Sequence, residues 1–503
     1  MFEGKNISIE VNNKIIISNL SFVLNKNDRL AIIGEEGNGK STLLKSLCSN
    51  CDYAKIEGVI NYKGNSVGYL AQSLDSQFLK LLVYNFLFSE DVDYYNKINE
   101  FYGFLPELML DETILEKQLR FLSGGEKVKV QLLKVLLDNP DILLLDEPTN
   151  DLDIATLEWL EGFINRCSKP IIYVSHDETL LANTANMILH LELTHKKTKA
   201  KHTLEKNNYE TYVEQRISYI SKTNQVARKE KQEFNKQQEK LTQVMQKVHH
   251  EQDTISRSNP HGGRLLKKKM KSLKSQERRL ENQELTKKID VEESINIFFE
   301  NASMPASKVI ADIKIESLKI NDLVLCENIN FKITGNNKIA IIGKNGVGKT
   351  TLLKQIHEDL KTRTDISVGY MPQDYDSILS KYKTPIDFIG VTHKDDISLI
   401  RSYMGNLNFT VEEMESNITN LSGGSKAKLI LLKLIYDKNN VLILDEPTRN
   451  VSPLSNPVIR KALQNFSGTI ISISHDRKYI SEVANLVYEL DKTGIKLMHN
   501  NLL

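Results

Sequence analysis

The sequence predicts an α/β protein made of two copies of one domain, joined by a long antiparallel α-helical hairpin. Four short motifs occur twice in the same order, which indicates an internal duplication. Short apolar runs alternate with helical stretches in each copy, as in a parallel sheet covered by helices. The intervening segment is charged and carries apolar residues at helical spacing. We therefore expect a first domain over residues 1–195, a linker over 196–304 and a second domain over 305–503.

The composition excludes several broad classes of protein. The chain has 503 residues, of which 40% are hydrophobic, so it can bury large cores and is not disordered as a whole. Four cysteines are too few for a disulfide scaffold and fit a reducing compartment. The first residues lack the pattern of a signal peptide, and no run of about 18 apolar residues is present that could span a membrane. We expect a cytoplasmic protein with no membrane partner.

The duplication is defined by four motifs and by the spacing between them. In both copies the Ser of the second motif precedes the Asp of the third motif by 23 residues. That Asp precedes the His of the fourth motif by 30 residues. The four pairs are residues 34–42 and 343–351, 122–127 and 421–426, 144–149 and 443–448, and 175–177 and 474–476. We call the first pair the phosphate loops and the second pair the signature motifs.

Each motif falls next to an expected element. The apolar runs 30–33 and 339–342 predict buried strands that enter the phosphate loops, followed by a helix such as 41–47. Further buried parallel strands are predicted at 142–145, 171–174, 441–444 and 470–473.

The linker differs from the rest of the chain in charge and periodicity. Residues 196–290 contain 24 Lys and Arg against 12 Asp and Glu, a net charge of +12, which leaves −11 elsewhere. This separation favours a polyanionic partner for the linker. We expect a first helix over about 209–250, roughly 60 Å long, and a tip near 251–263. The residues at helical spacing are Phe234, Leu241, Met245 and Val248, then Leu266, Met270, Leu273 and Leu280.

The phosphate loops predict two nucleotide sites. Glycines allow consecutive backbone N–H groups to converge on phosphates, and the Lys reaches the β- and γ-phosphates. Lys40 and Lys349 take that role, and Ser41 and Thr350 offer hydroxyls to Mg²⁺. The full set is Gly34, Gly37, Asn38, Gly39, Lys40, Ser41 and Thr42, with Gly343, Asn345, Gly346, Gly348, Lys349, Thr350 and Thr351.

The later strands supply the remaining predicted site residues. An Asp at a strand end would hold the metal, and the Glu after it would orient the attacking water. A His would contact the γ-phosphate, and a Gln would contact metal and water. The predicted metal ligands are Ser41, Gln72, Asp146, Thr350, Gln373 and Asp445, and the predicted catalytic residues are Glu147, Glu446, His176 and His475.

The signature motif, together with the phosphate loop, D-E-P-T and S-H-D, resembles the ATP-binding cassette superfamily. Two cassettes in one chain with a charged helical linker resemble the ABC-F translation factors, and residues 208–212, at the entry to the first linker helix, are also similar to that family. The resemblance implies a monomer whose cassettes sandwich two ATP molecules head to tail. Ser123, Gly124 and Gly125 would then face the ATP on Lys349, and Ser422, Gly423 and Gly424 the ATP on Lys40.

The resemblance also implies a partner, the exit site of a 70S-type ribosome, with the linker reaching towards rRNA and P-site tRNA. Basic residues suit phosphate contacts. The expected RNA-binding residues are Lys267, Lys268, Lys269, Lys271, Lys274, Arg278 and Arg279. The expected linker-tip residues are Ser256, Arg257, Ser258, Asn259, Pro260 and His261.

Residues 445–453 are similar to the antibiotic-resistance branch of that family, which protects ribosomes from lincosamides, streptogramin A and pleuromutilins. A housekeeping ABC-F factor is the nearest alternative, and a transporter ATPase subunit is another. The sequence also departs from the family. Val11 and Ile320 stand where cassettes often place an aromatic residue on adenine, and Glu36 stands where the second copy has Asn345. We therefore expect the two ATP sites to be unequal.

Overall fold

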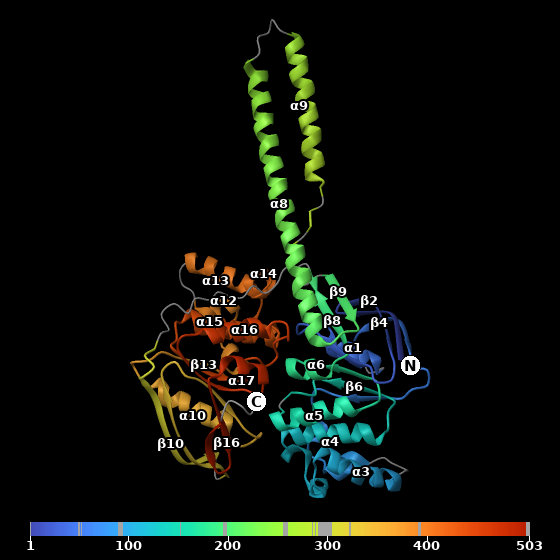
Figure 1. The fold of residues 1–503 in the computed structure, drawn as a ribbon, viewed down its shortest axis with the longest axis vertical. Coiled ribbons are helices and arrows are strands. Elements are labelled where there is room, and N and C mark those ends of the chain that lie inside the picture. Colours follow the sequence, from blue (N-terminus) through green and yellow to red (C-terminus); the bar gives the residue numbers. More distant parts are fainter. Residues whose placement is uncertain are drawn as a thin grey trace. The chain divides into compact units, whose positions relative to one another are not determined.

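The computed structural model describes residues 2–48, 51, 53–88, 94–150, 152–194, 199–254, 260–283, 285–286, 288–289, 304–320, 323–390 and 394–498 (Figure 1). The chain forms two compact units. One unit comprises residues 1–210 and 292–503 and holds both repeats, and the other comprises residues 211–291.

The first repeat is built on a six-stranded sheet with the order β5-β6-β7-β3-β8-β9. Neighbouring strands are parallel except β8 and β9, which are antiparallel. All five residues of β6 are buried, as expected of a strand covered on both faces. The bounds are β3 Arg29–Ile33, β5 Val67–Leu70, β6 Ile142–Asp146, β7 Ile171–Val174, β8 Met187–Leu193 and β9 Lys199–Glu205.

A second, antiparallel sheet of the first repeat has the order β2-β1-β4. Its strands are β1 Phe2–Val11, β2 Lys14–Leu24 and β4 Lys55–Asn61. Phe2, Ile7 and Ile9 of β1 are fully buried and pack with residues of β3, so the two sheets share one core. The helices are α1 Lys40–Leu47, α2 Val83–Phe88, α3 Tyr94–Leu108, α4 Gly124–Leu137, α5 Ile154–Arg166 and α6 Glu178–Thr184, with short 3₁₀ turns at Ser76–Phe78, Glu112–Glu116 and Leu119–Phe121.

The second repeat has the same plan. Its six-stranded sheet has the order β13-β14-β15-β12-β16-β17, which corresponds strand for strand to the first. The bounds are β12 Lys338–Ile342, β13 Val368–Met371, β14 Val441–Asp445, β15 Thr469–Ile473, β16 Leu486–Asp491 and β17 Gly494–Met498, beside the antiparallel pair β10 Val309–Ile320 and β11 Leu323–Thr334. The predicted duplication is therefore confirmed at the level of topology.

The described residues of the second repeat also form helices. They are α10 Lys349–Lys361, α11 Asp376–Leu379, α12 Pro385–Ile389, α13 Lys394–Asn406, α14 Val411–Glu415, α15 Gly423–Tyr436, α16 Asn456–Asn465 and α17 Arg477–Val483, with a 3₁₀ turn at Ile418–Asn420. Of these helices, α10 and α15 contact strands of the six-stranded sheet.

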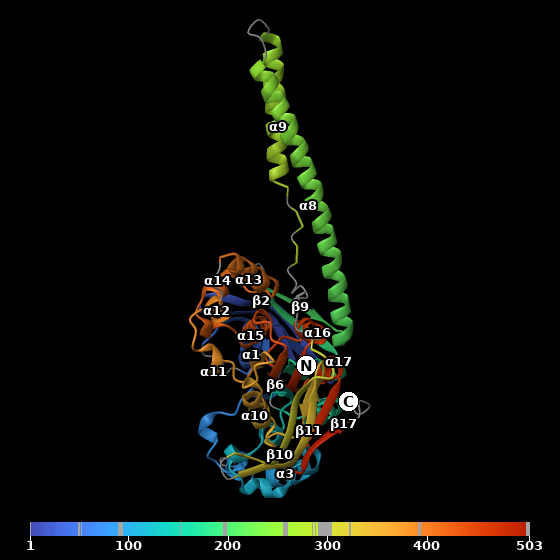
Figure 2. The ribbon, with the colours of Figure 1, turned by 90° about the vertical axis from the view of Figure 1, so that its left-hand side faces the viewer.

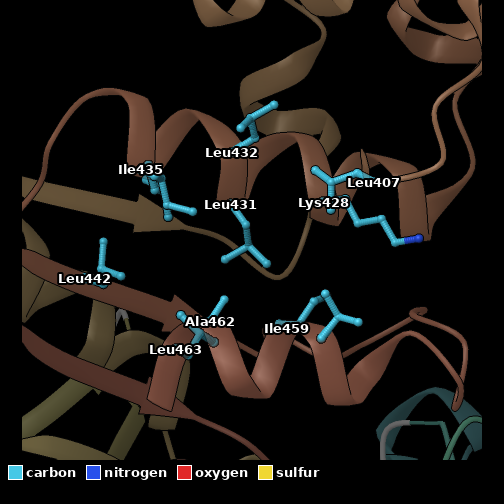
Figure 3. Close-up of a pocket in the computed structure, with 11 residues that line it drawn as sticks. Leu407, Lys428, Leu431, Leu432, Ile435, Leu442, Ile459, Ala462 and Leu463 are labelled. Atoms are coloured by element: carbon cyan, nitrogen blue, oxygen red, sulfur yellow. The ribbon is translucent and has the colours of Figure 1, made fainter. Parts of the chain in front are cut away.

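A small apolar cavity of about 20 Å³ lies between α15 and α16 (Figure 3). Leucine and isoleucine side chains from both helices line it, among them Leu431 and Ile459. The space is close to the minimum that one water needs, and its lining is almost wholly apolar. We interpret it as a packing gap and not as a ligand site.

The linker unit contains two long helices, α8 Tyr209–Thr254 and α9 Pro260–Glu281. Figures 1 and 2 both show α9 running back alongside α8. Val248 of α8 and Leu273 of α9 are buried although most of both helices is exposed, which fits the predicted apolar seam. No helix among the described residues is both long and apolar enough to cross a bilayer.

Two predicted boundaries need correction. The first repeat does not end at residue 195, because β9 pairs with β8 as the antiparallel edge of the first sheet. The predicted tip at 251–263 is too wide, because α8 extends to Thr254 and α9 begins at Pro260. Proline is favoured at a first helical position, where its missing N–H has no partner in any case. Pro260 and His261 thus begin a helix, while Ser256, Arg257, Ser258 and Asn259 lie outside the described residues.

Candidate nucleotide sites

Each phosphate loop lies between a buried strand and the first turn of a helix. In the first repeat β3 leads into the loop and α1 begins at Lys40. Gly34 has a φ of 146°, and a Cβ there would lie 2.3 Å from the carbonyl oxygen of Leu191. Gly343 of the second loop has a φ of 142° and would meet Leu490 in the same way, at 2.2 Å. Glycine is required at both positions because no side chain fits.

The loop lysines point into their own loops. Lys40 Nζ donates to the carbonyl oxygens of Gly34 at 2.9 Å and Glu35 at 3.0 Å. Lys349 Nζ makes the matching bonds to Gly343 at 2.7 Å and Lys344 at 3.0 Å. Burial lowers the pKa of both ammonium groups, while nearby carboxylates oppose the shift. Each ammonium therefore sits where a phosphate held by the loop would meet it.

The predicted metal ligands of the first site are adjacent. Ser41 Oγ donates to Asp146 Oδ1 at 2.9 Å, and the Tyr69 hydroxyl donates to Asp146 Oδ2 at 3.0 Å. Burial raises the pKa of Asp146 despite these two hydrogen bonds. In the second site burial likewise raises the pKa of Asp445, and a hydrogen bond from Thr350 opposes the shift.

The donor set fits Mg²⁺. Asp445 Oδ2 is buried and has no hydrogen-bond partner among the described residues, so a cation would offset its desolvation. One carboxylate, one hydroxyl and the phosphates of a nucleotide form the usual oxygen environment of Mg²⁺. Among the described residues there is no cluster of three His, Cys, Asp or Glu that would bind a metal by itself. Ser41 with Asp146, and Thr350 with Asp445, would therefore hold Mg²⁺ together with the nucleotide.

Glu147 is held by three neighbours in the first site. Gln72 Nε2 and Asn150 Nδ2 each donate to Glu147 Oε2 at 2.7 Å, and His176 Nε2 lies 3.3 Å from Oε1. Burial alone would raise the pKa of Glu147, but the hydrogen bond and charge of His176, with Asn150, hold the pKa at about 2. The carboxylate is therefore ionised and fixed in place.

Glu446 occupies the same place in the second site with a different environment. Burial and the charge of Asp445 raise the pKa of Glu446 to about 8. Burial and the charge of Lys349 lower the pKa of His475 to about 3, and its Nδ1 has no partner among the described residues. Gln373 is exposed and makes no described bond to Glu446. The structure thus brings Gln72 to Glu147 but does not bring Gln373 to Glu446.

Glu147 and Glu446 both have an unusual backbone conformation. The φ of Glu147 is 48° and that of Glu446 is 53°, in the left-handed region that residues with a Cβ rarely adopt. Such conformations cluster at functional sites, where the surrounding structure maintains them.

The signature motifs form the starts of α4 and α15. Ser123 and Ser422 cap these helices by accepting hydrogen bonds from Glu126 N and Ser425 N, each at 3.2 Å. Gly424 N donates to Glu36 Oε2 at 2.9 Å, so the second signature motif meets the first phosphate loop.

A second contact joins the two repeats near the same site. His176 Nδ1 lies 2.9 Å from the carbonyl oxygen of Val451. At the other site the negative charge of Asp153, from the first repeat, acts on Lys349 of the second repeat. Burial lowers the pKa of Lys349, and Asp153 opposes that change. Each site therefore receives residues from both repeats.

Sequence reasoning missed several residues that the structure places at the sites. Tyr69 contacts Asp146, and Asn150 contacts Glu147. The available signal was recurrence, because Tyr370 occupies the place of Tyr69 in the second copy of the G-Y-x-x-Q sequence. The seven predicted RNA-binding residues of α9 belong to the other compact unit, residues 211–291.

A family model described as ABC transporter matches residues 17–150 and again residues 326–449, which include both phosphate loops and both D-E-P motifs. The chain belongs to the ATP-binding cassette family. It is an ATPase with two cassettes, the first formed by the first repeat and the second by the second.

Proteins similar to this two-cassette chain occur in bacteria and plants. The ATP-binding protein YdiF of Bacillus subtilis is 30% identical, over 96% of this chain and 78% of that protein. The ATP-binding protein Uup of Buchnera aphidicola is 30% identical over 98% of this chain and 81% of that protein. ABC transporter F family member 5 of Arabidopsis thaliana is 30% identical over 77% of this chain and 54% of its own length.

Two solved structures share the fold of the cassette chain. The RNase-L inhibitor superposes with a TM-score of 0.59 at 16% sequence identity, over 98% of this chain and 90% of its own. The archaeal ribosome recycling factor aABCE1, solved with the ribosomal stalk protein aP1, gives the same TM-score, identity and coverage. The predicted fold of two cassettes with a long helical insertion is confirmed.

Proposed function

We propose that this protein is an ABC-F-type ATPase that acts on the ribosome, binding at the tRNA exit site and contacting rRNA and P-site tRNA with its hairpin. Two similarities support the proposal, to an F-family member of Arabidopsis and, in fold, to an archaeal ribosome recycling factor. The observation that carries it is the basic hairpin that joins the two cassettes in the sequence.

The hairpin has the chemistry of a surface for nucleic-acid backbone. On α9 the apolar residues Leu266, Met270 and Leu273 are partly or fully buried, so the charged residues face outward. The seven predicted RNA-binding residues are exposed, and none forms an ion pair with another described residue: Lys267, Lys268, Lys269, Lys271, Lys274, Arg278 and Arg279. Uncompensated cations attract phosphates and release their counterions on binding. Such contacts supply affinity without reading sequence.

The cassettes would control this binding through ATP. Mg²⁺ held by Ser41 with Asp146, and by Thr350 with Asp445, would supply charge neutralisation of the phosphates. Lys40 and Lys349 hold the phosphates, while Glu147 and Glu446 orient the attacking water. Because each site contains residues of both repeats, bound ATP favours the arrangement in which the cassettes are joined, and hydrolysis removes that preference.

A double variant tests the proposal. In Glu147→Gln with Glu446→Gln the sites should bind ATP without hydrolysing it, so the protein should cosediment with 70S ribosomes in ATP and arrest translation when expressed. The matched control is Lys40→Ala with Lys349→Ala, which should not bind ATP or cosediment. If the Gln variant shows no ATP-dependent cosedimentation at low salt, the ribosomal proposal is wrong. Membrane association in ATP would instead favour a transporter subunit.

We further propose that the protein protects ribosomes from drugs of the peptidyl-transferase centre. Its support is the sequence of residues 445–453. Expression in a susceptible host should raise resistance to lincosamides, streptogramin A or pleuromutilins, and replacing residues 256–263 by a Gly-Ser turn should abolish the effect while leaving ATPase activity intact. Cosedimentation without any resistance in the wild type would indicate a housekeeping factor.

A further inference from the structure

The carboxylate of Glu36, in the first phosphate loop, lies at the start of α15, the helix that begins within the second signature motif. Gly424 N donates to Glu36 Oε2 at 2.9 Å, although the two residues are 388 positions apart. A Cβ on Gly423 would lie 2.9 Å from the same oxygen, so the glycine leaves the space that the carboxylate fills. The helix that begins here, α15, has 14 residues, and its first N–H groups have no partner within the helix. An anion at this end is stabilised by those groups and by the helix dipole.

A γ-phosphate on Lys40 would need the same place. The family resemblance implies that the second signature motif faces the ATP bound at Lys40. In the structure Gly424 of that motif contacts Glu36, which lies in the same phosphate loop as Lys40. The negative charge of Glu36 also acts on Lys40, where it opposes the fall in pKa caused by burial. A γ-phosphate held by Lys40 and Gly424 would therefore displace the carboxylate and lie close to its charge. Two anions cannot share one backbone donor without repulsion.

The second phosphate loop lacks this group. Asn345 stands in the place of Glu36 and is uncharged. The loops are otherwise alike, with lysines bonded to matching carbonyl oxygens. The competing carboxylate is therefore a property of the Lys40 site alone.

We propose that Glu36 makes the Lys40 site select a nucleoside diphosphate over a triphosphate. With ADP bound, the carboxylate stays on Gly424 N, because no γ-phosphate competes for that N–H. With ATP bound, the carboxylate has to leave. The inference rests on the assignment of Lys40 and Gly424 to one nucleotide site and does not depend on the ribosome.

The test measures ATP and ADP binding at one site at a time. Lys349→Ala disables the other site, and Glu147→Gln prevents hydrolysis at the Lys40 site. In this background, isothermal titration calorimetry with Mg²⁺ gives the ratio of ATP to ADP affinity. Glu36→Asn should raise that ratio about tenfold, equivalent to about 1.4 kcal/mol. Glu36→Asp keeps the charge but shortens the reach to Gly424, so it should give a smaller increase.

Two controls separate this contact from net charge. Glu35→Asn removes the same charge one residue earlier and should leave the ratio within twofold. In the mirrored background of Lys40→Ala and Glu446→Gln, Asn345→Glu should lower the ATP to ADP ratio of the Lys349 site.

The outcomes distinguish the possible failures. The proposal is overturned if Glu36→Asn shifts the ratio less than twofold, or if Glu35→Asn shifts it equally. If adding Lys40→Ala to the Lys349→Ala background leaves nucleotide binding unchanged, the site assignment itself is wrong. Thermal unfolding checks that each variant is folded, which is expected because Glu36 is exposed.

Discussion

Arg460 of the second cassette and Glu178 of the first form a buried ion pair, with side chains 3% and 5% exposed. Arg460 Nη1 donates to Glu178 Oε1 at 2.5 Å and Nη2 donates to Oε2 at 3.2 Å. Arg460 Nε also donates to Glu482 Oε2 at 2.7 Å. Paired hydrogen bonds of this kind fix geometry as well as supplying energy. The pair therefore joins α6 of one cassette to α16 of the other.

Arg460→Ala should destabilise the protein by about 3–5 kcal/mol, because it leaves Glu178 buried without its partner. The double variant Arg460→Met with Glu178→Met should recover most of that loss, because the charges that lose a partner, Glu482 and Lys478, are 46% and 31% exposed and not buried. Urea unfolding measures both. The matched control is Arg401→Ala, since the Arg401 and Glu415 side chains are 50% and 57% exposed and such pairs contribute about 1 kcal/mol or less. A double variant as unstable as Arg460→Ala would contradict this account.

The two catalytic glutamates should contribute unequally to turnover. Glu446→Gln should slow steady-state ATP hydrolysis about tenfold more than Glu147→Gln, equivalent to a barrier difference of about 1.4 kcal/mol. The reason is that the Lys40 site, which contains Glu147, also contains Glu36, whose charge competes with a γ-phosphate, whereas the Lys349 site has the uncharged Asn345 in that place and should carry most of the turnover. Phosphate-release assays on the single variants decide this. Equal losses, or a larger loss from Glu147→Gln, would count against it.

The different pKa values of Glu446 and Glu147 predict how stability depends on pH without nucleotide. The folded pKa of Glu446, about 8, is above its ordinary value of 4.5, so its contribution to stability is lost as pH rises from 4.5 to 8. Glu446→Gln should therefore gain stability relative to wild type over this range, by up to about 1.4 kcal/mol per pH unit.

Glu147→Gln is the matched control for that experiment. The pKa of Glu147 is lowered to about 2, so its contribution is present above pH 4.5 and lost only as pH falls from 4.5 towards 2. The gap between this variant and wild type should stay constant from pH 5 to 9. Denaturant unfolding at several pH values measures both gaps, and parallel curves for the two variants would refute the predicted difference.

The basic face of α9 should determine how ribosome binding depends on salt. Replacing Lys267, Lys268 and Lys269 by Gln should lower the affinity for ribosomes at least about tenfold at about 0.1 M salt. It should also reduce the slope of log affinity against log salt concentration by about 2 to 3 in magnitude. Both quantities are measured by cosedimentation with ribosomes across a salt series. The protein that carries Glu147→Gln and Glu446→Gln is compared with and without the three lysine replacements.

Three exposed lysines of the second cassette provide the control, Lys319, Lys332 and Lys461. Their replacement by Gln changes net charge equally but should leave the slope within experimental error. Equal effects of the two triple variants would show that α9 makes no particular phosphate contacts.

The sequence by itself predicted the duplication, the strands, the phosphate loops and the hairpin. These depend on local information, namely apolar periodicity, glycines that adopt positive φ and residues at fixed spacing. Local patterns define element ends less well. The edge strand β9 falls within the predicted linker because its alternation is weak, and the predicted tip is too wide because Pro260 begins a helix instead of ending one.

Only the tertiary structure decided which surfaces meet. Glu36 and Gly424, His176 and Val451, and Arg460 and Glu178 are 388, 275 and 282 residues apart, and no local periodicity encodes such pairs. The tertiary structure also gives the glutamates of the two identical D-E-P-T motifs different pKa values, because the pKa of a carboxylate depends on burial and on neighbours from distant segments. Glu147 has His176 and Asn150 close to its carboxylate and is ionised, whereas Glu446 is desolvated beside Asp445 and retains its proton up to about pH 8.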